Sequence, residues 1–352
     1  MRMDAAGIFI GDQTHGFGGF TRAPVKGNIL RRMTETDNIA RMADKVSTSI
    51  FEVFGWARIA PMNQSFDCCS ALHDTKIGKH PTDIVFGYDD AYQQRRIYVN
   101  TDLKSYNRTT IARPRVAGAI RSLLQATECA NISPQWQDMY VDTEESFEAI
   151  GMLFVYNHDG GYDRDFATLV DGIAESNFEV EAPVRGAIIG PDDIEFLTAV
   201  ANDLRTEVGK SLDRIRFHYP DLVQTKATSP YHSCATVEML TAPWISAIVQ
   251  EDQGAKHILY YRHEGSDDEF KYLIDFLFRY QVVASEQRIS IRCPYATPTA
   301  PAQLQTAKKQ YASRFPEVGG LEGRLDKIEF GEAPLMTKNF SEVYLGMEPR
   351  DG

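Results

Sequence analysis

The sequence predicts an α/β protein, and three observations favour that class. Residues 82–86 and 96–104 are rich in β-branched and aromatic side chains and are separated by a polar turn, which is typical of paired strands. Residues 35–54 and 112–130 carry apolar side chains at helical spacing. Residues 256–293 have the pattern of a strand, an apolar helix and a second strand. Strand and helix patterns therefore occur together in both halves of the chain, as they do in α/β folds.

Length and composition limit the class of protein further. A chain of 352 residues is long enough for about two domains. It has no apolar run of the ~18 residues that a membrane span needs, and its start lacks a signal-peptide pattern. The five cysteines form no C-x-x-C pair and suggest no disulfide framework. We therefore expect a cytoplasmic protein that does not enter a membrane.

The predicted hairpin places three reactive side chains together. Asp83 opens its first strand, and Asp102 and Lys104 lie near the end of its second strand. Because side chains alternate along a strand, Asp102 and Lys104 point to one face and Leu103 to the other. The sequence therefore predicts two carboxylates and a lysine on one face of a small sheet.

This combination suits metal-assisted hydrolysis of phosphodiester bonds. Carboxylates of Asp83 and Asp102 are hard ligands for Mg²⁺ or Mn²⁺, and a bound metal polarises the phosphoryl group and lowers the pKa of its water. Lys104 would place a positive charge beside the attacking water or the developing charge on phosphorus. The alternative interpretation is a pair of exposed strand carboxylates with a surface lysine.

The chain resembles the PD-(D/E)xK nuclease superfamily over about residues 30–160. The residues that carry this resemblance lie between Pro81 and Lys104. Asp83 matches the acid that opens one strand in that family, and Asp102 and Lys104 match the (D/E)-x-K that ends the next. The sequence has Pro81-Thr82-Asp83 where the family name expects Pro-Asp. The resemblance implies a restriction-endonuclease-like core, a mixed sheet flanked by helices, followed here by a second α/β region. It also implies a divalent-metal-dependent nuclease.

In the resembled family the first helix often supplies a further acid, and the sequence offers Glu35 and Glu52. Glu35 lies four residues before Ile39, on the apolar face, whereas Glu52 lies off that face and is expected in solvent. We favour Glu35 as a third metal ligand. The alternative is that Glu35 only provides a favourable charge at the positive end of the helix.

Charge is distributed unevenly along the chain. The net charge is −12, but residues 1–135 hold 17 Lys and Arg against 13 Asp and Glu, and the remainder holds 20 against 36. Basic side chains concentrate in residues 95–121, where phosphate contacts would require them. We expect these to bind nucleic acid, DNA rather than RNA; a solvated charged face is the alternative. The predicted contact residues are Arg95, Arg96, Arg108, Arg113 and Arg115.

The acidic remainder would repel a polyanion, so we expect it to contact protein. The predicted division is a nuclease core over residues 1–160 and an acidic α/β region over 161–352 that binds a partner or forms a homo-oligomer. A role in bacterial anti-phage defence is expected because stand-alone enzymes of the resembled family often serve there. Two alternatives stay open: a structural or partner-binding subunit with a coincidental motif, and a nucleotide phosphoesterase.

Residues 60–80 are predicted to be irregular. They contain Cys68, Cys69 and His73, but nothing there has the spacing of zinc ligands. His73 is expected on the surface.

Overall fold

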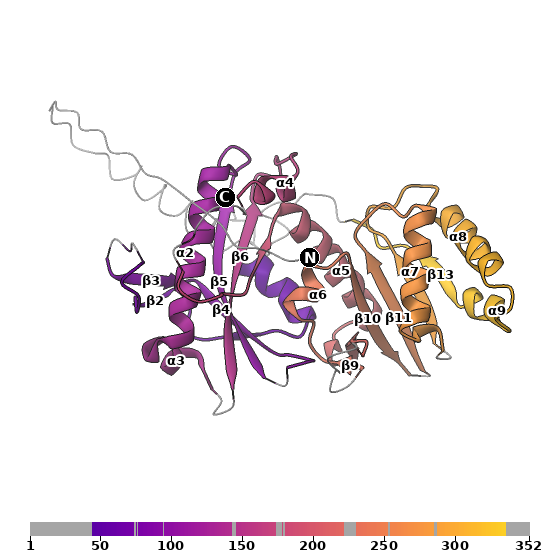
Figure 1. Ribbon diagram of the computed structural model, residues 1–352, viewed down its shortest axis with the longest axis horizontal. Helices are drawn as coiled ribbons and strands as arrows, with labels where there is room; N and C mark the ends of the chain where they lie inside the picture. The colour runs from indigo at the N-terminus through magenta and orange to yellow at the C-terminus, as the bar shows by residue number, and fades with distance from the viewer. Residues whose placement is uncertain are drawn as a thin grey trace, which may run out of the picture.

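The computed structural model describes residues 44–335, apart from residues 74, 76, 94, 143–145, 174–177, 179, 222–229, 253 and 285–286. In that part of the chain, the two large sheets and their helices are stacked in layers along the long axis of the molecule (Figure 1), and a third sheet is a two-stranded pair. The mixed α/β architecture agrees with the restriction-endonuclease-like fold expected from the sequence.

The first sheet has five strands in the order β1-β4-β5-β6-β7. The predicted hairpin is confirmed, because β4 and β5 pair antiparallel and β1 adds antiparallel to β4. β6 and β7 continue the sheet in parallel with β5, so the sheet is mixed. The bounds are β1 (Ala57–Ile59), β4 (Ile84–Asp89), β5 (Arg96–Tyr106), β6 (Phe147–Asn157) and β7 (Gly186–Ile189).

Helices cover both faces of this sheet, and the alternation of side chains along the strands explains how. On β5, Tyr98 points toward α2 (Arg113–Ile132) and α3 (Pro134–Tyr140), whereas Val99 points to the opposite face. That opposite face packs against the helix at residues 44–53 and against α5 (Pro191–Val208). α4 (Phe166–Asp171) joins the α2 side through Phe166. Burial on both faces makes the sheet an interior layer.

The expectation of irregular structure over residues 60–80 is wrong. β2 (Gln64–Asp67) and β3 (Lys79–Thr82) form a separate antiparallel pair. Phe66 is the one fully buried apolar side chain of these strands, so the hydrophobic alternation that predicts a strand is weak. The expectation for His73 is also wrong, because it is buried with an exposed fraction of 7%. Its neighbours are described below.

The second sheet has six strands in the order β13-β12-β11-β10-β8-β9. β8, β9, β10 and β11 pair antiparallel, and β11, β12 and β13 run parallel, so the predicted strand–helix–strand unit is confirmed. The strand bounds are β8 (Ile215–His218), β9 (Tyr231–His232), β10 (Trp244–Glu251), β11 (Gly254–Tyr261), β12 (Arg288–Arg292) and β13 (Ile328–Gly331).

Three helices connect the parallel strands and cover the outer face of this sheet: α7 (Asp267–Arg279), α8 (Ala300–Arg314) and α9 (Leu321–Asp326). Ser266 caps α7, because its hydroxyl accepts from the Glu269 N–H while the Glu269 carboxylate accepts from the Ser266 N–H. This is the capping box that the acidic start of the helix suggests. The short α6 (Val237–Thr241) precedes β10.

α5 lies between the two sheets (Figure 1). Met152 of β6, Leu197 of α5 and Ala247 of β10 belong to one continuous buried cluster. β7 and α5 follow residue 160 in the chain but pack with the first sheet. The division into residues 1–160 and 161–352 stays a prediction. None of the helices in the described ranges is long and apolar enough to cross a membrane.

Candidate active site

The register of the β4–β5 hairpin places Asp83 opposite Asp102. Ile84 pairs with Thr101 at the start of β4, so the next pair outward is Asp83 with Asp102. Directly opposed residues in an antiparallel pair have Cβ atoms ~5 Å apart and point to the same face of the sheet. The two carboxylates therefore meet where β4 begins and β5 ends.

Hydrogen bonds fix this arrangement on both strands. The Leu103 N–H donates to Asp83 Oδ2 at 2.8 Å, which ties the Asp83 carboxylate to the backbone of β5. The Lys104 ammonium contacts Asp102 Oδ1, and the Asp83 carboxylate is close enough to Asp102 to raise its pKa. Leu103 packs into the opposite face, as the alternation predicts. The structure thus brings together the three residues that the sequence singled out.

The site concentrates negative charge in a partly enclosed position. Burial and the neighbouring Asp83 carboxylate raise the pKa of Asp102 to about 6, although Lys104 opposes that rise. Burial lowers the pKa of Lys104, but Asp102 and Asp83 outweigh it, so the net pKa of Lys104 is raised. Two close carboxylates in such a place fit a hard divalent cation, because the cation would relieve both burial and mutual repulsion. The donor set therefore suits Mg²⁺ or Mn²⁺.

A comparison with known families agrees with this geometry. Residues 33–193 match the family model of the GAPS4 protein PD-(D/E)XK nuclease domain. This region belongs to the PD-(D/E)xK nuclease superfamily. The match contains the whole five-stranded sheet and the three residues of the site. No curated protein matches the chain closely enough to count as a relative.

The third acid expected for the PD-(D/E)xK site is Glu35, which lies outside the described residues. Glu52, the other candidate, is exposed and approaches Arg205 at 3.5 Å. The described part of its helix packs on the face of the sheet that Leu103 occupies, through Val46 and Ile50. Asp102 projects from the other face. Glu52 is therefore remote from the paired carboxylates, and the role of Glu35 stays a prediction.

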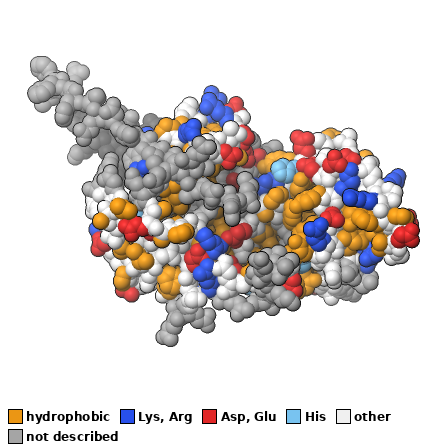
Figure 2. Space-filling view, in the orientation of Figure 1, with side chains coloured by type: hydrophobic (Ala, Val, Ile, Leu, Met, Phe, Trp, Pro, Cys, Tyr) orange, Lys and Arg blue, Asp and Glu red, His pale blue; other side chains and the backbone are white. Residues whose placement is uncertain are grey.

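The basic residues predicted to bind DNA lie at both ends of β5. Arg95 and Arg96 are at its start, about 26 Å from Lys104 at ~3.3 Å per residue, and they form ion pairs with Glu148 and Asp89. Arg108, Arg113 and Arg115 follow its end and are exposed. Lys and Arg side chains are visible at that edge, over the loops after β5 and β6 (Figures 1 and 2). The nucleic-acid role of all five stays a prediction.

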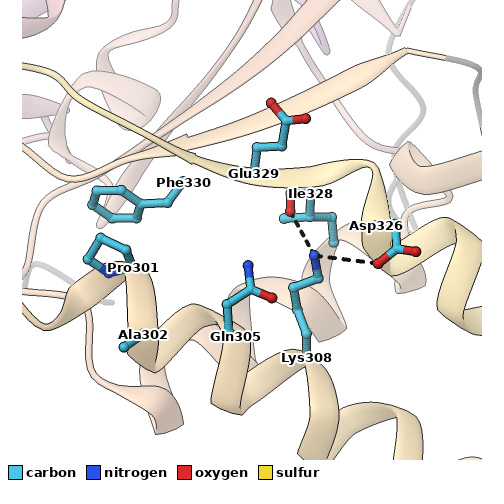
Figure 3. A pocket seen from close by; sticks show the side chains of 8 residues that line it. All are labelled: Pro301, Ala302, Gln305, Lys308, Asp326, Ile328, Glu329 and Phe330. Atoms are coloured by element: carbon cyan, nitrogen blue, oxygen red, sulfur yellow. Dashed lines mark hydrogen bonds and ion pairs between the residues drawn. The ribbon is translucent and has the colours of Figure 1, made fainter.

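A hollow in the described surface lies far from the nuclease site, between α8 and β13 (Figure 3). Lys308 reaches across it from α8 and donates to the Ile328 carbonyl at 3.1 Å, with Asp326 beside it. A second hollow adjoins the start of α7. Asp83, Asp102 and Lys104 line neither hollow.

Proposed function

We propose that the protein is a divalent-metal-dependent endonuclease that hydrolyses phosphodiester bonds in DNA. The observation that carries this proposal is the opposed pair Asp83 and Asp102 with Lys104 in contact, within a domain that matches a PD-(D/E)XK nuclease model. Asp83 and Asp102 would hold the cation, which is Mg²⁺ or Mn²⁺ from the oxygen donors present. When bound, such a cation supplies Lewis-acid activation of the phosphate and the attacking water.

The residues of the chain have separate tasks in this proposal. The Leu103 N–H holds Asp83 through Oδ2, and Asp83 Oδ1 would bind the cation. Lys104 keeps its proton, because the two carboxylates raise its pKa against the effect of burial. A charged lysine next to Asp102 stabilises the negative charge that develops on the phosphate oxygens in the transition state.

Several features favour DNA over a small nucleotide. The site lies where β4 begins and β5 ends, and exposed Arg108, Arg113 and Arg115 follow it in the chain. Extended basic surfaces track a phosphate backbone, whereas nucleotides are held in concave pockets.

The biological setting belongs to the same proposal. We propose a role in anti-phage defence, which the match to the nuclease domain of the GAPS4 protein supports, and a cytoplasmic location. We place a partner or homo-oligomer contact on the acidic region after residue 160. α7 offers an apolar patch there, because Tyr272 has an exposed fraction of 61% and lies against Trp244.

The test is a cleavage assay on plasmid and linear duplex DNA, RNA and nucleoside triphosphates, with Mg²⁺ and with a chelator. We expect Mg²⁺-dependent DNA cleavage that Asp102→Ala abolishes. Asp89→Ala is the matched control, since it lies at the other end of the same hairpin and loses only an exposed ion pair with Arg96. Cleavage by Asp102→Ala, or in the presence of the chelator, would refute the proposed site. Activity confined to nucleotides would favour the phosphoesterase.

A further inference from the structure

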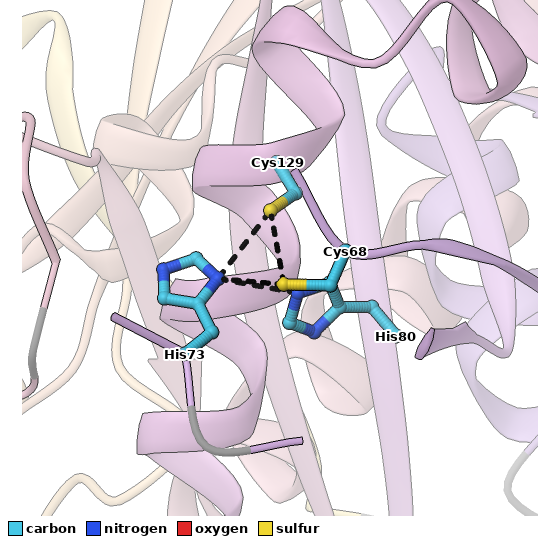
Figure 4. A group of neighbouring side chains, drawn as sticks. All are labelled: Cys68, His73, His80 and Cys129. Atoms are coloured by element: carbon cyan, nitrogen blue, oxygen red, sulfur yellow. Dashed lines mark hydrogen bonds between the residues drawn. The ribbon is translucent and has the colours of Figure 1, made fainter. Parts of the chain in front are cut away.

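Two cysteines and two histidines converge outside the nuclease site (Figure 4). Cys68 follows β2, His73 lies in the β2–β3 loop, His80 is in β3, and Cys129 is near the end of α2. His73 Nδ1 lies 3.5 Å from Cys68 Sγ, 3.4 Å from Cys129 Sγ and 3.3 Å from His80 Nε2, and the two sulfurs are 4.0 Å apart. One potential ligand atom from each residue points into a common centre.

These separations are those of a tetrahedral zinc site. Bonds of about 2.3 Å to sulfur and about 2.0–2.1 Å to nitrogen, at tetrahedral angles, put neighbouring ligand atoms about 3.3–3.8 Å apart. The four distances above run from 3.3 to 4.0 Å. Two thiols with two imidazoles are a donor set that selects zinc over Mg²⁺, which prefers oxygen.

Surrounding groups orient the ligands in the way a metal requires. Glu128 Oε2 lies 2.8 Å from His73 Nε2, and its other oxygen accepts from the N–H groups of Glu181 and Ala182. A proton on His73 Nε2 leaves the lone pair of Nδ1 directed at the thiols. A carboxylate behind a histidine is a common partner of metal-bound imidazole, because it fixes the tautomer and the ring orientation. The Cys69 N–H also donates to Cys129 Sγ at 3.2 Å.

The burial of the four residues indicates that solvent has little access to this site. Cys129, His73 and His80 are buried, and Cys68 is partly buried. Four protein ligands leave no open coordination position for a water or a substrate, which distinguishes structural zinc sites from catalytic ones. The four residues also connect the β2–β3 hairpin to α2. Apolar packing between them is small, since Phe66 is the only buried apolar side chain of β2 and β3.

We propose that Cys68, His73, His80 and Cys129 bind a structural zinc ion that fastens the β2–β3 hairpin to α2. His80 lies in β3, and Asp83 directly follows the end of that strand. Zinc would therefore fix the segment that leads into the nuclease site without taking part in the reaction. This inference does not depend on the proposed nuclease activity.

The spacing of these four residues in the sequence does not predict a zinc site. His73 and His80 come from a loop and a strand of one short hairpin, and Cys129 comes from a helix far along the chain. The usual paired spacing of zinc motifs is absent, so the convergence becomes visible only in three dimensions.

The test begins with the full chain purified without chelators from zinc-supplemented medium. We expect about one zinc per chain by elemental mass spectrometry, since the four ligands complete one tetrahedral site. Replacement by Co²⁺ should give the intense visible bands of tetrahedral cobalt and a thiolate-to-cobalt charge-transfer band. Cys68→Ser should lose the zinc, whereas the matched variant Cys69→Ser should keep it, because Cys69 contacts Cys129 Sγ through its backbone N–H and its thiol is directed to the Asp67 carbonyl.

Two further variants separate this site from folding and from the nuclease metal. Glu128→Gln, which leaves all four ligands in place, should weaken zinc binding about 10–100-fold. Asp102→Ala should retain zinc in full. A zinc-free native protein, a cobalt complex without the thiolate band, or an unchanged zinc content in Cys68→Ser would overturn the proposal. A Cys68–Cys129 disulfide in the native protein would overturn it as well.

Discussion

Lys104 differs from the two carboxylates beside it, because a lysine does not bind the cation that the carboxylates attract. Its contact with Asp102 places positive charge where the reacting phosphate would lie. Such a charge contributes more in the transition state than in the ground state. Metal binding and turnover should therefore respond differently to its removal.

We expect Lys104→Ala to retain Mg²⁺ affinity and to reduce single-turnover cleavage at least roughly 100-fold, the usual loss when one stabilising donor is removed. Calorimetric titration with Mg²⁺, paired with a single-turnover assay, measures both quantities. Lys271→Ala is a suitable control, since it removes helix-surface ion pairs with Asp267 and Asp268, far from the site in the chain. Lost metal affinity with unchanged chemistry would contradict the role assigned to Lys104.

A second prediction concerns two buried histidines of the six-stranded sheet. Burial lowers the pKa of His218 to about 4, and burial together with His218 lowers that of His257 to about 3. Both therefore stay neutral in the folded protein at pH values where the unfolded chain, with a pKa near 6.5, takes up protons. Stability is fully present above pH ~6.5 and is lost as the pH falls toward 4.

Each histidine should lower the free energy of unfolding by about 1.4 kcal/mol per pH unit in that window. Urea unfolding at a series of pH values measures the slope. His257→Gln should reduce this slope by about 1.4 kcal/mol per pH unit, because the variant takes up one proton fewer on unfolding. The same slope in the variant and the native protein would show that His257 does not carry this pH dependence.

The grouping of the three candidate site residues was predictable because it is local. Asp83, Asp102 and Lys104 belong to one hairpin, and strand alternation alone places the last two on one face. The acids of the first helix are different, because Glu52 faces away from the site although it lies on the predicted helix. The cysteine and histidine cluster was missed because its fourth member, Cys129, comes from α2 and not from the β2–β3 hairpin that holds the other three. Long-range packing, which sequence periodicity does not record, brings them together.

At the scale of elements, the close contact between α2 and β6 determines how tightly the helix lies on the nuclease sheet. Gly151 of β6 sits under this helix, and a Cβ built there would lie 2.9 Å from Thr127 Oγ1 and 3.1 Å from Leu123 Cγ. Such contacts are too short for a well-packed interior, so the absence of a side chain at Gly151 allows the helix to approach.

We expect Gly151→Ala to destabilise the protein by about 1–3 kcal/mol, the usual cost of overpacking a core. Gly118→Ala, in α2 itself, has nothing within 4 Å of the added carbon and should stabilise by about 0.5–1 kcal/mol. Chemical denaturation of both variants provides the measurement. Equal effects at the two positions would refute the packing argument.

Long periodic elements were predicted well and short or mildly patterned ones were not. α2 and α7 carry buried faces at helical spacing, and the capping box of α7 follows from Ser266 and Glu269. β2 and β3 were missed because each has four residues and little apolar alternation. α8 was also overlooked, although its Ala, Gln and Lys residues are good helix formers. Most of its apolar side chains are alanines, so the hydrophobic periodicity of the sequence does not indicate this helix strongly.

At the scale of the whole molecule, an ion-pair network joins the nuclease layers to the second sheet. Arg292 of β12 contacts Asp203 and Glu207 of α5, and it has a side-chain exposure of 8%. Tyr260 donates to Asp203 at 2.5 Å, and Lys256 pairs with Glu207 at 2.8 Å. The network lies beside the apolar cluster that α5 shares with both sheets. The two parts should therefore unfold together.

We expect Arg292→Met to lower the free energy of unfolding by about 3–5 kcal/mol, because it leaves Asp203 and Glu207 poorly compensated in a partly buried position. Arg279→Met, which breaks an exposed pair with Asp275, should change stability by less than about 1 kcal/mol. Calorimetry should show a single transition in both. Two separate transitions in the native protein would contradict the shared core.

The central claim is that Asp83 and Asp102 together hold the catalytic cation. Anomalous diffraction at the manganese edge, from crystals grown with Mn²⁺, locates that cation directly. We predict a peak within coordination distance of both carboxylates, and its loss in Asp102→Asn, which keeps the shape of the side chain but removes its charge. A manganese peak bound elsewhere, or the same peak retained in Asp102→Asn, would contradict the account.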